Sequence, residues 1–280
     1  MMQSSGIKKR RVGNTALTIV SGVFALVFLA PILWSLAVSF QIEGRQILSV
    51  WDWFKPPYTL QNYPEIILNS EVPLWMFNSL FIAVVATVLT VFLSAMAAYA
   101  IAKIEFKGSR LLLFYFLLGL MVPGEATIVP LFITVNGFDL IDTYPGLIFP
   151  AIAGSMNLII MVTFLRNIPN ELIEAVKIDG GNHMTIFFKI VLPLSKAVLS
   201  TVSIFAFIGS WNNYLWPLLC AMSSSKFTLP IGIPTFAGTY TVDYVKPLTA
   251  NMVASIPMIV LYIIFEKQIV QGITMTGVKG

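Results

Sequence analysis

Side chains that could carry chemistry are few in this chain of 280 residues. It has one cysteine, Cys220, and one histidine, His183. A lone cysteine excludes an intrachain disulfide and a multi-cysteine metal site, and a lone histidine excludes a multi-histidine metal cluster. Neither the phosphate-binding sequence G-x-x-x-x-G-K-S/T nor the G-x-S-x-G of a serine enzyme occurs. The sequence therefore predicts a protein that is not an enzyme and holds no catalytic residue, metal or cofactor of its own.

Three polar side chains lie inside apolar segments and could belong to a transport path. Glu125 lies between Pro123 and Pro130, which interrupt helical hydrogen bonding. A carboxylate inside a membrane is costly, so it either lines a path or hydrogen-bonds to the helix bundle. For Asn212 and Asn213 the alternatives are hydrogen bonds between helices and a place along the path of the solute.

The composition requires a membrane protein. Hydrophobic residues make up 57% of the chain, charged residues 11%, and the mean hydropathy is +0.85. Soluble domains carry about 25% charged residues, so this chain cannot cover a water-exposed surface. An ordinary cytosolic enzyme is excluded, and the 17 scattered basic residues do not form a nucleic-acid-binding patch.

Intervals without charged residues locate six apolar segments, each near or above the roughly 20 residues that cross a bilayer core. The predicted transmembrane helices span residues 13–40, 74–102, 111–136, 144–165, 197–220 and 248–267. The first could instead be a cleavable signal peptide, but its apolar stretch is long and no A-x-A site follows it. The predicted fold class is an all-α integral membrane protein with one transmembrane domain, residues 1–280.

The distribution of lysine and arginine predicts the orientation. Of the 17 basic residues, 13 lie in the two terminal segments and the second and fourth loops, whereas 4 lie in the other loops. Because cytoplasmic loops carry the excess of positive charge, both termini are predicted to be cytoplasmic. Residues 166–196 then form a cytoplasmic loop and residues 221–247 an external loop.

The loop 166–196 has the pattern of two short helices around a glycine corner. A first helix begins at Pro169 and ends at Gly180, and a second begins near Asn182. Asp179 is expected to cap the second helix. On physical grounds alone, an amphipathic hairpin lying on the bilayer explains this pattern as well as a docking element does.

The spacing of residues in this loop resembles the EAA motif of binding-protein-dependent ABC importer permeases. That motif reads EAA, three residues, G, nine residues, I-x-L-P. Here Val176 stands in place of the second alanine, and the remaining motif positions agree. The matching residues are Glu174, Ala175, Val176, Gly180, Ile190, Leu192 and Pro193.

Further segments are similar to the carbohydrate branch of that family. They are Ile178-Asp179-Gly180, Trp211-Asn212-Asn213-Tyr214 followed by Pro217, Met121-Val122-Pro123-Gly124-Glu125, and Gly277-Val278-Lys279-Gly280. The resemblance covers essentially the whole chain. It is strongest to the shorter, six-span permease of maltose-type sugar importers, which is a multi-pass protein of the bacterial inner (cytoplasmic) membrane with the type I permease fold.

The resemblance implies a set of partners. A sister permease would form the other half of the translocation path, two ATPase subunits would bind ATP and Mg, and an extracytoplasmic protein would deliver the sugar. The EAA loop, including Asp179, would couple to the ATPase, and Gly277 and Lys279 would make a second contact unless the tail is a frayed terminus. In this family the sister permease can hold the sugar alone, so Glu125, Asn212 and Asn213 could line the path without forming a sugar site.

The alternative function is an ion-coupled secondary transporter. Such proteins usually show inverted repeats or paired broken helices, and neither is evident in the sequence. Glu125 is the one feature that would suit a proton site.

Overall fold

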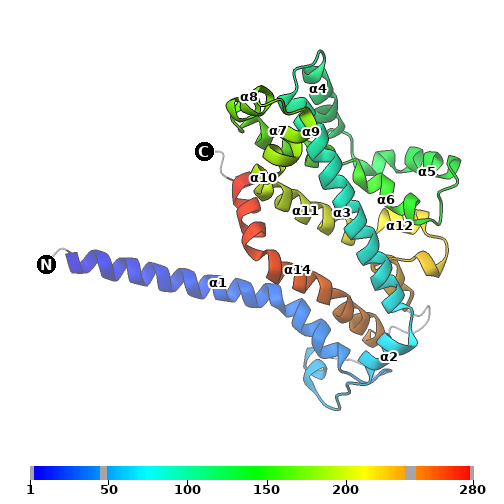
Figure 1. Ribbon diagram of the computed structural model, residues 1–280. Helices are drawn as coiled ribbons and strands as arrows, with labels where there is room; N and C mark the ends of the chain where they lie inside the picture. The colour runs from blue at the N-terminus through cyan, green and yellow to red at the C-terminus, as the bar shows by residue number, and fades with distance from the viewer. Residues whose placement is uncertain (1–2, 45–48, 237–243, 278–280) are drawn as a thin grey trace. The chain divides into compact units, whose positions relative to one another are not determined.

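The computed structural model describes residues 3–44, 49–236 and 244–277, and α-helices dominate these segments (Figure 1). The α-helices are α1 (Gln3–Ser39), α2 (Asn62–Asn69), α3 (Val72–Lys103), α4 (Ser109–Gly119), α5 (Ile128–Gly137), α6 (Tyr144–Ile152), α7 (Ser155–Arg166), α8 (Asn170–Ile178), α9 (His183–Ile186), α10 (Leu192–Leu194), α11 (Lys196–Trp211), α12 (Leu215–Cys220), α13 (Leu229–Gly232) and α14 (Val245–Gly277). Short 3₁₀ or π turns are η1 (Val50–Phe54), η2 (Gly124–Thr127), η3 (Phe187–Val191), η4 (Ser224–Lys226) and η5 (Ile233–Phe236).

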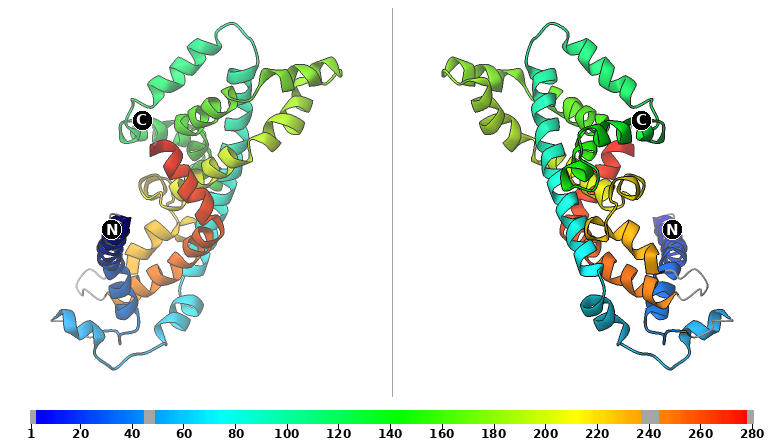
Figure 2. Two further views of the ribbon diagram at one scale, coloured as in Figure 1. Left: turned by 90° about the vertical axis from the view of Figure 1, so that its left-hand side faces the viewer. Right: turned by 90° about the vertical axis from the view of Figure 1, so that its right-hand side faces the viewer.

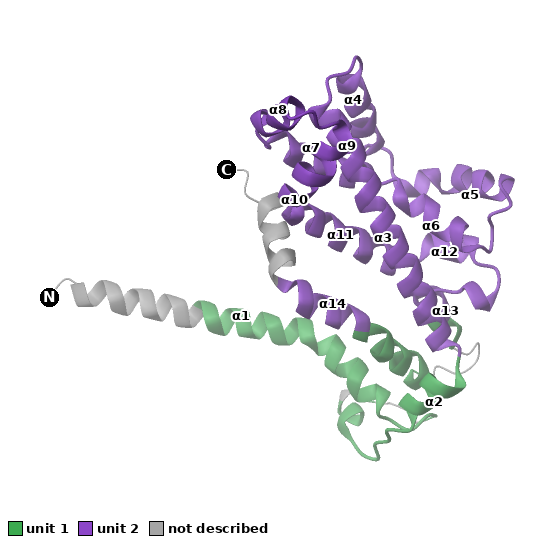
Figure 3. Ribbon diagram, viewed as in Figure 1, with its two compact units in different colours: residues 1–70, 233–256 green, residues 71–232, 257–280 purple. Residues whose placement is uncertain are grey.

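The chain divides into two compact units, coloured separately in Figure 3. Unit 1 contains residues 1–70 and 233–256, and unit 2 contains residues 71–232 and 257–280. Each unit is described by itself below.

Buried polar side chains organise unit 1 where α1 ends. The Nδ2 of Asn62 donates hydrogen bonds to the carbonyls of Ser39 and Gln41, both at 2.8 Å. The fully buried Gln41 donates from Nε2 to the carbonyl of Trp53 at 2.9 Å. The Oγ1 of Thr249, on α14, also donates to Ser39 O. The bonds from Asn62 and Thr249 satisfy carbonyls at the end of α1, which a helix leaves without helical partners.

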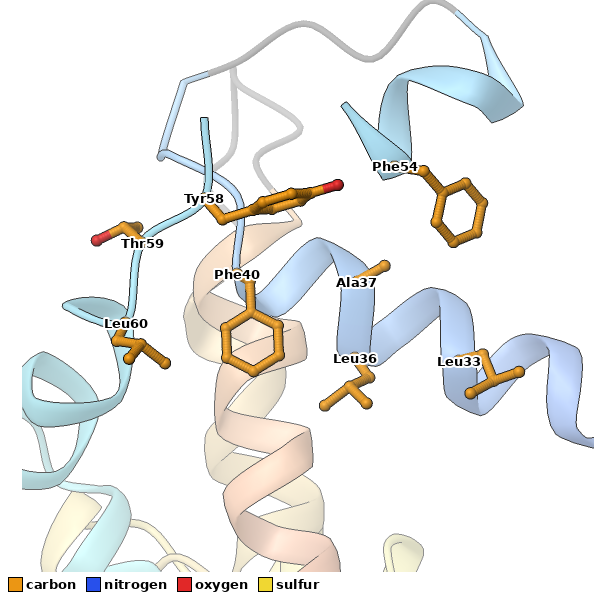
Figure 4. Close-up of a pocket in the computed structure, with 8 residues that line it drawn as sticks. All are labelled: Leu33, Leu36, Ala37, Phe40, Phe54, Tyr58, Thr59 and Leu60. Carbon is orange, nitrogen blue, oxygen red and sulfur yellow. The ribbon is translucent and has the colours of Figure 1, made fainter. Parts of the chain in front are cut away.

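An open apolar groove of about 690 Å³ lies beside the same end of α1. Figure 4 shows its lining, which consists of Leu33, Leu36, Ala37, Phe40, Phe54, Tyr58, Thr59 and Leu60. Nearby, the rings of Trp34 and Trp53 pack with centroids 5.2 Å apart. Aromatic side chains gathered at one end of an apolar helix are typical of the membrane–water interface.

Helix α3 is the central element of unit 2 and packs along its length against α6, α7 and α11. Close packing is possible because small residues, among them Ala86, Ala95 and Ala98, are buried along α3. A core of larger side chains, including Met161, Leu165 and Phe187, surrounds the C-terminal half of α3. In Figure 2 the yellow-green helices α8 and α9 project from this end of the cyan helix α3.

Three helices are long and apolar enough to cross a membrane: Leu17–Ser39, Val72–Lys103 and Val245–Glu266. Three further pairs would qualify if each bent pair is one span. They are Ser109–Gly119 with Gly124–Gly137, bent by 98°, Tyr144–Ile152 with Ser155–Arg166, bent by 44°, and His183–Leu194 with Lys196–Trp211, bent by 80°. Up to six spans are therefore compatible with the described residues, and the placement of both termini on the cytoplasmic side stays a prediction.

The chain breaks within each of the segments expected to be continuous helices at 111–136, 144–165 and 197–220, and the 80° bend between Leu194 and Lys196 lies just before the last of them. The first segment breaks where Pro123 takes an extended conformation, with ψ of 133°. The last breaks after Trp211, so that α11 and α12 are separate. An interval without charge reports apolarity and contains no information about bending, which is why these breaks were not evident in the sequence.

Gly146 on α6 allows the turn before that helix to approach closely. A Cβ at this position would lie 2.0 Å from the carbonyl oxygen of Leu140 and 3.2 Å from Sγ of Cys220. The carbonyl of Gly146 also accepts a hydrogen bond from the Nε1 of buried Trp216 at 3.0 Å. A side chain here must displace backbone, which cannot yield as a flexible side chain does.

We expect Gly146→Ala to lower the free energy of unfolding by about 1–3 kcal/mol, because overpacking forces the backbone to shift. The measurement is the thermal midpoint of the purified chain in detergent. Gly209→Ala on α11 is the matched control, since its Cβ would meet nothing within 4 Å. That control should be neutral or stabilising by up to about 1 kcal/mol, and equal midpoints for the two variants would contradict the prediction.

Candidate functional site

The EAA loop (residues 166–196) contains the two short helices that its sequence predicts. Helix α8 follows Pro169, which is extended with ψ of 135° and occupies the N-cap position. Glu171 lies in the first turn of α8 and Lys177 in its last turn, where each charge is favourable to the helix dipole. Helix α9 follows and continues into the π turn η3.

The corner between α8 and α9 depends on both glycines. Gly180 has φ of +79°, a left-handed conformation that favours glycine, and its N–H donates to the carbonyl of Lys177 at 3.0 Å. The N–H of Gly181 donates to the carbonyl of Val176 at 2.8 Å. A Cβ on Gly181 would lie 2.5 Å from Cγ1 of Val176 and 2.9 Å from its carbonyl oxygen. The predicted glycine corner is therefore confirmed.

The expectation that Asp179 caps the second helix was wrong. The N-cap of α9 is Asn182, whose Oδ1 accepts hydrogen bonds from the N–H and Oγ1 of Thr185 at 2.9 and 3.0 Å. Asp179 is instead the C-cap of α8, and its N–H donates to Ala175 O at 3.1 Å. Two glycines separate Asp179 from α9, whereas Asn182 immediately precedes it, and only the immediate neighbour can reach the first orphan N–H groups.

Helix α8 has one face in the core and one face exposed. Ile173 is 4% exposed and joins the core of unit 2, and Val176 packs half-buried against that core. The opposite face presents Glu174 and Ala175, together with Ile178, which is 86% exposed. Glu174 and Ile178 are four residues apart and lie on the same side of the helix.

The remaining motif residues lie at the return of the chain into the helix bundle. Ile190 and Leu192 are half-buried and Pro193 is exposed. Gly277 is the last residue of α14, and Lys279 lies outside the described residues. The structure thus brings Glu174, Ala175 and Gly180 together on the projecting part of the loop and places the I-x-L-P end at its base.

Glu125 lies in the turn η2, at the 98° break between α4 and α5. Its side chain is exposed and makes no hydrogen bond or ion pair with any described residue. The interpretation that it hydrogen-bonds to the helix bundle of its own chain therefore finds no support. The interpretation that it lines a path stays a prediction.

Asn212 and Asn213 bond to backbone groups at the break between α11 and α12. The Nδ2 of Asn212 donates to Ile208 O at 3.1 Å, and the Oδ1 of Asn213 accepts from the N–H of Trp216 at 3.4 Å. The side chain of Asn213 thus supplies an acceptor near the start of α12, whereas that of Asn212 adds a second donor to a carbonyl that already accepts the N–H of Asn212 at 3.0 Å. No described contact shows either residue bonding between packed helices, and their place along a path stays a prediction.

Comparison with known proteins places this arrangement in a family. Residues 90–275 match the family described as "Binding-protein-dependent transport system inner membrane component". The chain belongs to this family. It is therefore a permease subunit of an ABC importer and a membrane transport protein, not an enzyme.

Relatives of similar length support the assignment. The arabinooligosaccharides transport system permease of Bacillus subtilis is 33% identical, over 95% of each chain. The trehalose transport system permease of Mycobacterium tuberculosis is 35% identical, over 90% of this chain and 93% of the relative. The trehalose/maltose transport system permease of Thermococcus litoralis is 32% identical, over 92% and 94%. A crystal structure of a bacterial ABC transporter involved in alginate import has the same fold, with a TM-score of 0.81, 20% identity and coverage of 92% and 97%.

The permease also holds a loop at the N-terminal end of α3, a feature that the sequence did not reveal. The buried Asn78 donates from Nδ2 to the carbonyls of Ser225 and Phe227 at 3.0 and 2.9 Å, and its Oδ1 accepts from Tyr144 OH at 2.7 Å. The Nε1 of Trp75 donates to Ser224 O at 3.2 Å. The one signal for this role is an asparagine within an otherwise apolar segment.

Asp142 fixes the start of the same segment. With φ of +59°, it accepts hydrogen bonds from the N–H groups of Met222 and Ser223 at 2.9 and 3.0 Å and from Ser223 Oγ at 2.8 Å. These hydrogen bonds hold the pKa of the Asp142 carboxyl below its usual value, and the bond from the backbone N–H of Ser223 has the largest effect. The positive charge of nearby Lys226 lowers the pKa further.

We expect Asp142→Asn to lower the thermal midpoint of the purified permease at pH 7, because an amide cannot accept all three hydrogen bonds on its one oxygen. Since the pKa of Asp142 is lowered by folding, its contribution is complete above about pH 4 and is lost as the pH falls through the folded-state pKa. The difference in midpoint from the wild type should therefore shrink in acidic buffer.

Asp139→Asn is the matched control, since Asp139 is exposed, also has a positive φ of +56°, and has no described side-chain hydrogen bond. A difference between Asp142→Asn and wild type that is the same at pH 7 and in acid would refute the assignment.

Proposed function

We propose that this permease imports a sugar or oligosaccharide and forms half of the translocation path. The support is the chemistry in the names of its full-length relatives, which transport arabinooligosaccharides, trehalose, maltose and diacetylchitobiose. The partners in this proposal are a sister permease, two ATPase subunits that bind ATP and Mg, and an extracytoplasmic sugar-binding protein.

We further propose that the EAA loop is the element that couples to the ATPase. The observation that carries this proposal is the exposed face of α8, where a carboxylate, Glu174, and a large apolar side chain, Ile178, lie together. Ile178 is 86% exposed, so packing within its own chain contributes almost no burial of this side chain. A single exposed apolar side chain is ordinary on a protein surface, so Ile178 supports the proposal because it lies beside Glu174 of the EAA motif.

The corner geometry supports the same role. Moving a two-state transporter from 1:99 to 99:1 needs about 5.5 kcal/mol of differential binding. A free-energy difference of that size can be transmitted from the ATPase to the transmembrane helices only by an element with a fixed shape. The buried Ile173, the left-handed Gly180 and the tight approach at Gly181 give α8 a fixed direction relative to α9. Asp179 and the I-x-L-P residues would act by ending α8 and by directing the chain back into the bundle.

We expect Gly180→Val and Glu174→Lys to abolish ATP-driven uptake in the assembled importer. Valine costs about 1–2 kcal/mol or more in a left-handed conformation, so the first change should misdirect α8. The second places a positive charge on the contact surface. The measurements are ATPase co-purification and sugar uptake on the same membranes.

The matched controls are Gly108→Val and Glu105→Lys. Gly108 also has a positive φ, of +97°, and open space around it, so that the strain is similar but lies outside the EAA loop. Glu105 is exposed. Wild-type uptake with a fully bound ATPase in both EAA variants would remove the coupling assignment.

The proposed coupling requires the EAA loop to face the cytoplasm, which is testable by cysteine labelling. In a Cys220→Ala background, cysteines at Ser4 and Lys177 should resist a membrane-impermeant thiol reagent in intact cells, and one at Ser224 should react. Lys177 and Ser224 are both exposed in the fold, so protection reports the membrane and not burial. Reaction at Lys177 from outside would reverse the orientation.

A further inference from the structure

Two side chains near the C-terminal end of α3 contact the EAA loop. Tyr99 and Lys103 are four residues apart and lie on the same side of the helix. Neither belongs to the EAA motif, and both contact residues more than 60 positions away along the chain. All of these residues belong to unit 2.

Lys103 joins the end of α7 to the start of α8. Its Nζ donates to the carbonyl of Ile168 at 2.5 Å, to Oδ1 of Asn170 at 2.8 Å and, at a longer 3.5 Å, to the carbonyl of Arg166. Arg166 is the last residue of α7 and Ile168 lies two residues beyond it, where carbonyls have no helical donors. Asn170 is the first residue of α8.

Tyr99 makes the equivalent contact with the second helix of the loop. Its hydroxyl hydrogen-bonds to Nδ1 of His183, the first residue of α9, at 3.1 Å. The Tyr99 side chain is 5% exposed, and its ring packs against Phe187 with centroids 5.8 Å apart. The hydroxyl is therefore held in place by the core while it reaches the loop.

The two contacts attach both helices of the EAA loop at their first residues. The corner at Gly180 lies beyond them and has nothing within 4 Å of where a Cβ would be. A displacement of the exposed face of α8 therefore reaches the rest of unit 2 through the apolar packing of Ile173 and Val176 and through the bases of α8 and α9. At each base, the polar contacts identified above lead to α3.

Helix α3 is suited to carry that displacement further. Its 32 residues correspond to about 48 Å of continuous helix. At its other end, Trp75 and Asn78 bond to the segment that contains Ser224, Ser225 and Phe227. The same helix thus contacts both the EAA loop and the loop at its opposite end, which forms a contiguous physical network.

We propose that Tyr99 and Lys103 are positioning residues that transmit movement of the EAA loop to α3 during transport. This inference rests on the proposed coupling function of the loop. Without the two contacts, only the apolar packing of Ile173, Ile186 and Phe187 would join the loop to this end of α3, and α8 could follow the ATPase while α3 stays in place. ATP would then be hydrolysed without import.

The test uses the complete importer in liposomes, with the sister permease, ATPase and binding protein present. The variants are Tyr99→Phe, which removes one oxygen atom, and Lys103→Met, which keeps the length and loses the donors. The measurements are the amount of ATPase retained, the rate of ATP hydrolysis and the sugar imported per ATP. We expect retention and hydrolysis near wild type and a fall of about fivefold or more in sugar imported per ATP, the size of a typical coupling between two sites.

Conservative and surface variants distinguish a positioning role of Tyr99 and Lys103 from a purely structural one. Lys103→Arg retains a positive charge with several hydrogen-bond donors, so the amount of sugar imported per ATP should be close to that of the wild type. Tyr115→Phe and Lys107→Met remove the same groups from exposed positions and should behave as wild type. Should Lys103→Met fail to accumulate, Tyr99→Phe is the variant that decides, because it leaves the packing against Phe187 intact.

Two results would overturn the inference. One is an unchanged ratio of sugar to ATP in both Tyr99→Phe and Lys103→Met. The other is a loss of uptake in proportion to the amount of assembled complex, which would make the contacts merely structural. Glu174→Lys and Gly180→Val, measured alongside, distinguish the failures: if they lose the ATPase while the α3 variants stay fully coupled, only this inference is wrong. If they transport normally with the ATPase bound, the coupling function fails and this inference fails with it.

Discussion

Every backbone N–H and C=O inside a bilayer must find its partner within the protein, and this constraint explains where the permease places its polar side chains. Continuous helices satisfy the constraint by themselves. The chain departs from continuous helix at several points, and at those points short polar side chains supply the missing partners. Near the start of α12 the Oδ1 of Asn213 accepts from the N–H of Trp216 at 3.4 Å, and at the start of α6 the Oγ1 of Thr143 accepts from the N–H of Gly146 at 3.2 Å.

The same constraint explains why α3 is central to unit 2. It is the one long uninterrupted helix that lies wholly within that unit's described residues. Its backbone groups are therefore paired within the helix, and its polar side chains can bond to other segments. Buried alanines bring α7 and α11 close along its middle. Two of its polar residues, Asn78 and Lys103, lie toward the ends and bond to carbonyls of loops. The arrangement fixes two loops to one rigid element.

The sequence predicted the parts of this architecture that depend on local chemistry. Apolar intervals predicted helices, and proline, glycine and asparagine spacing predicted the corner at Gly180, because a left-handed residue and a helix stop are properties of a few neighbouring residues. The prediction that Asp179 caps α9 was also a local one, and it was wrong because Asn182 lies directly before that helix. The sequence could not show the bonds from Asn78 to Phe227 or from Tyr99 to His183, whose partners are separated by 149 and 84 residues. Such pairs depend on how the helices pack, and a pattern within one segment contains no information about it.

Exposed apolar surface has two different meanings in this permease, and the surrounding polarity distinguishes them. The apolar 18-residue window of α1 has none of its residues buried within the fold, and no charge interrupts it. A face of that kind matches lipid or another transmembrane helix. Ile178 is equally uncovered, but Glu174, Lys177 and Asp179 surround it in the sequence, and the helix that bears it is only nine residues long. In the proposed coupling, Ile178 belongs to the surface that a water-soluble ATPase contacts, whereas the apolar window of α1 is suited to the bilayer.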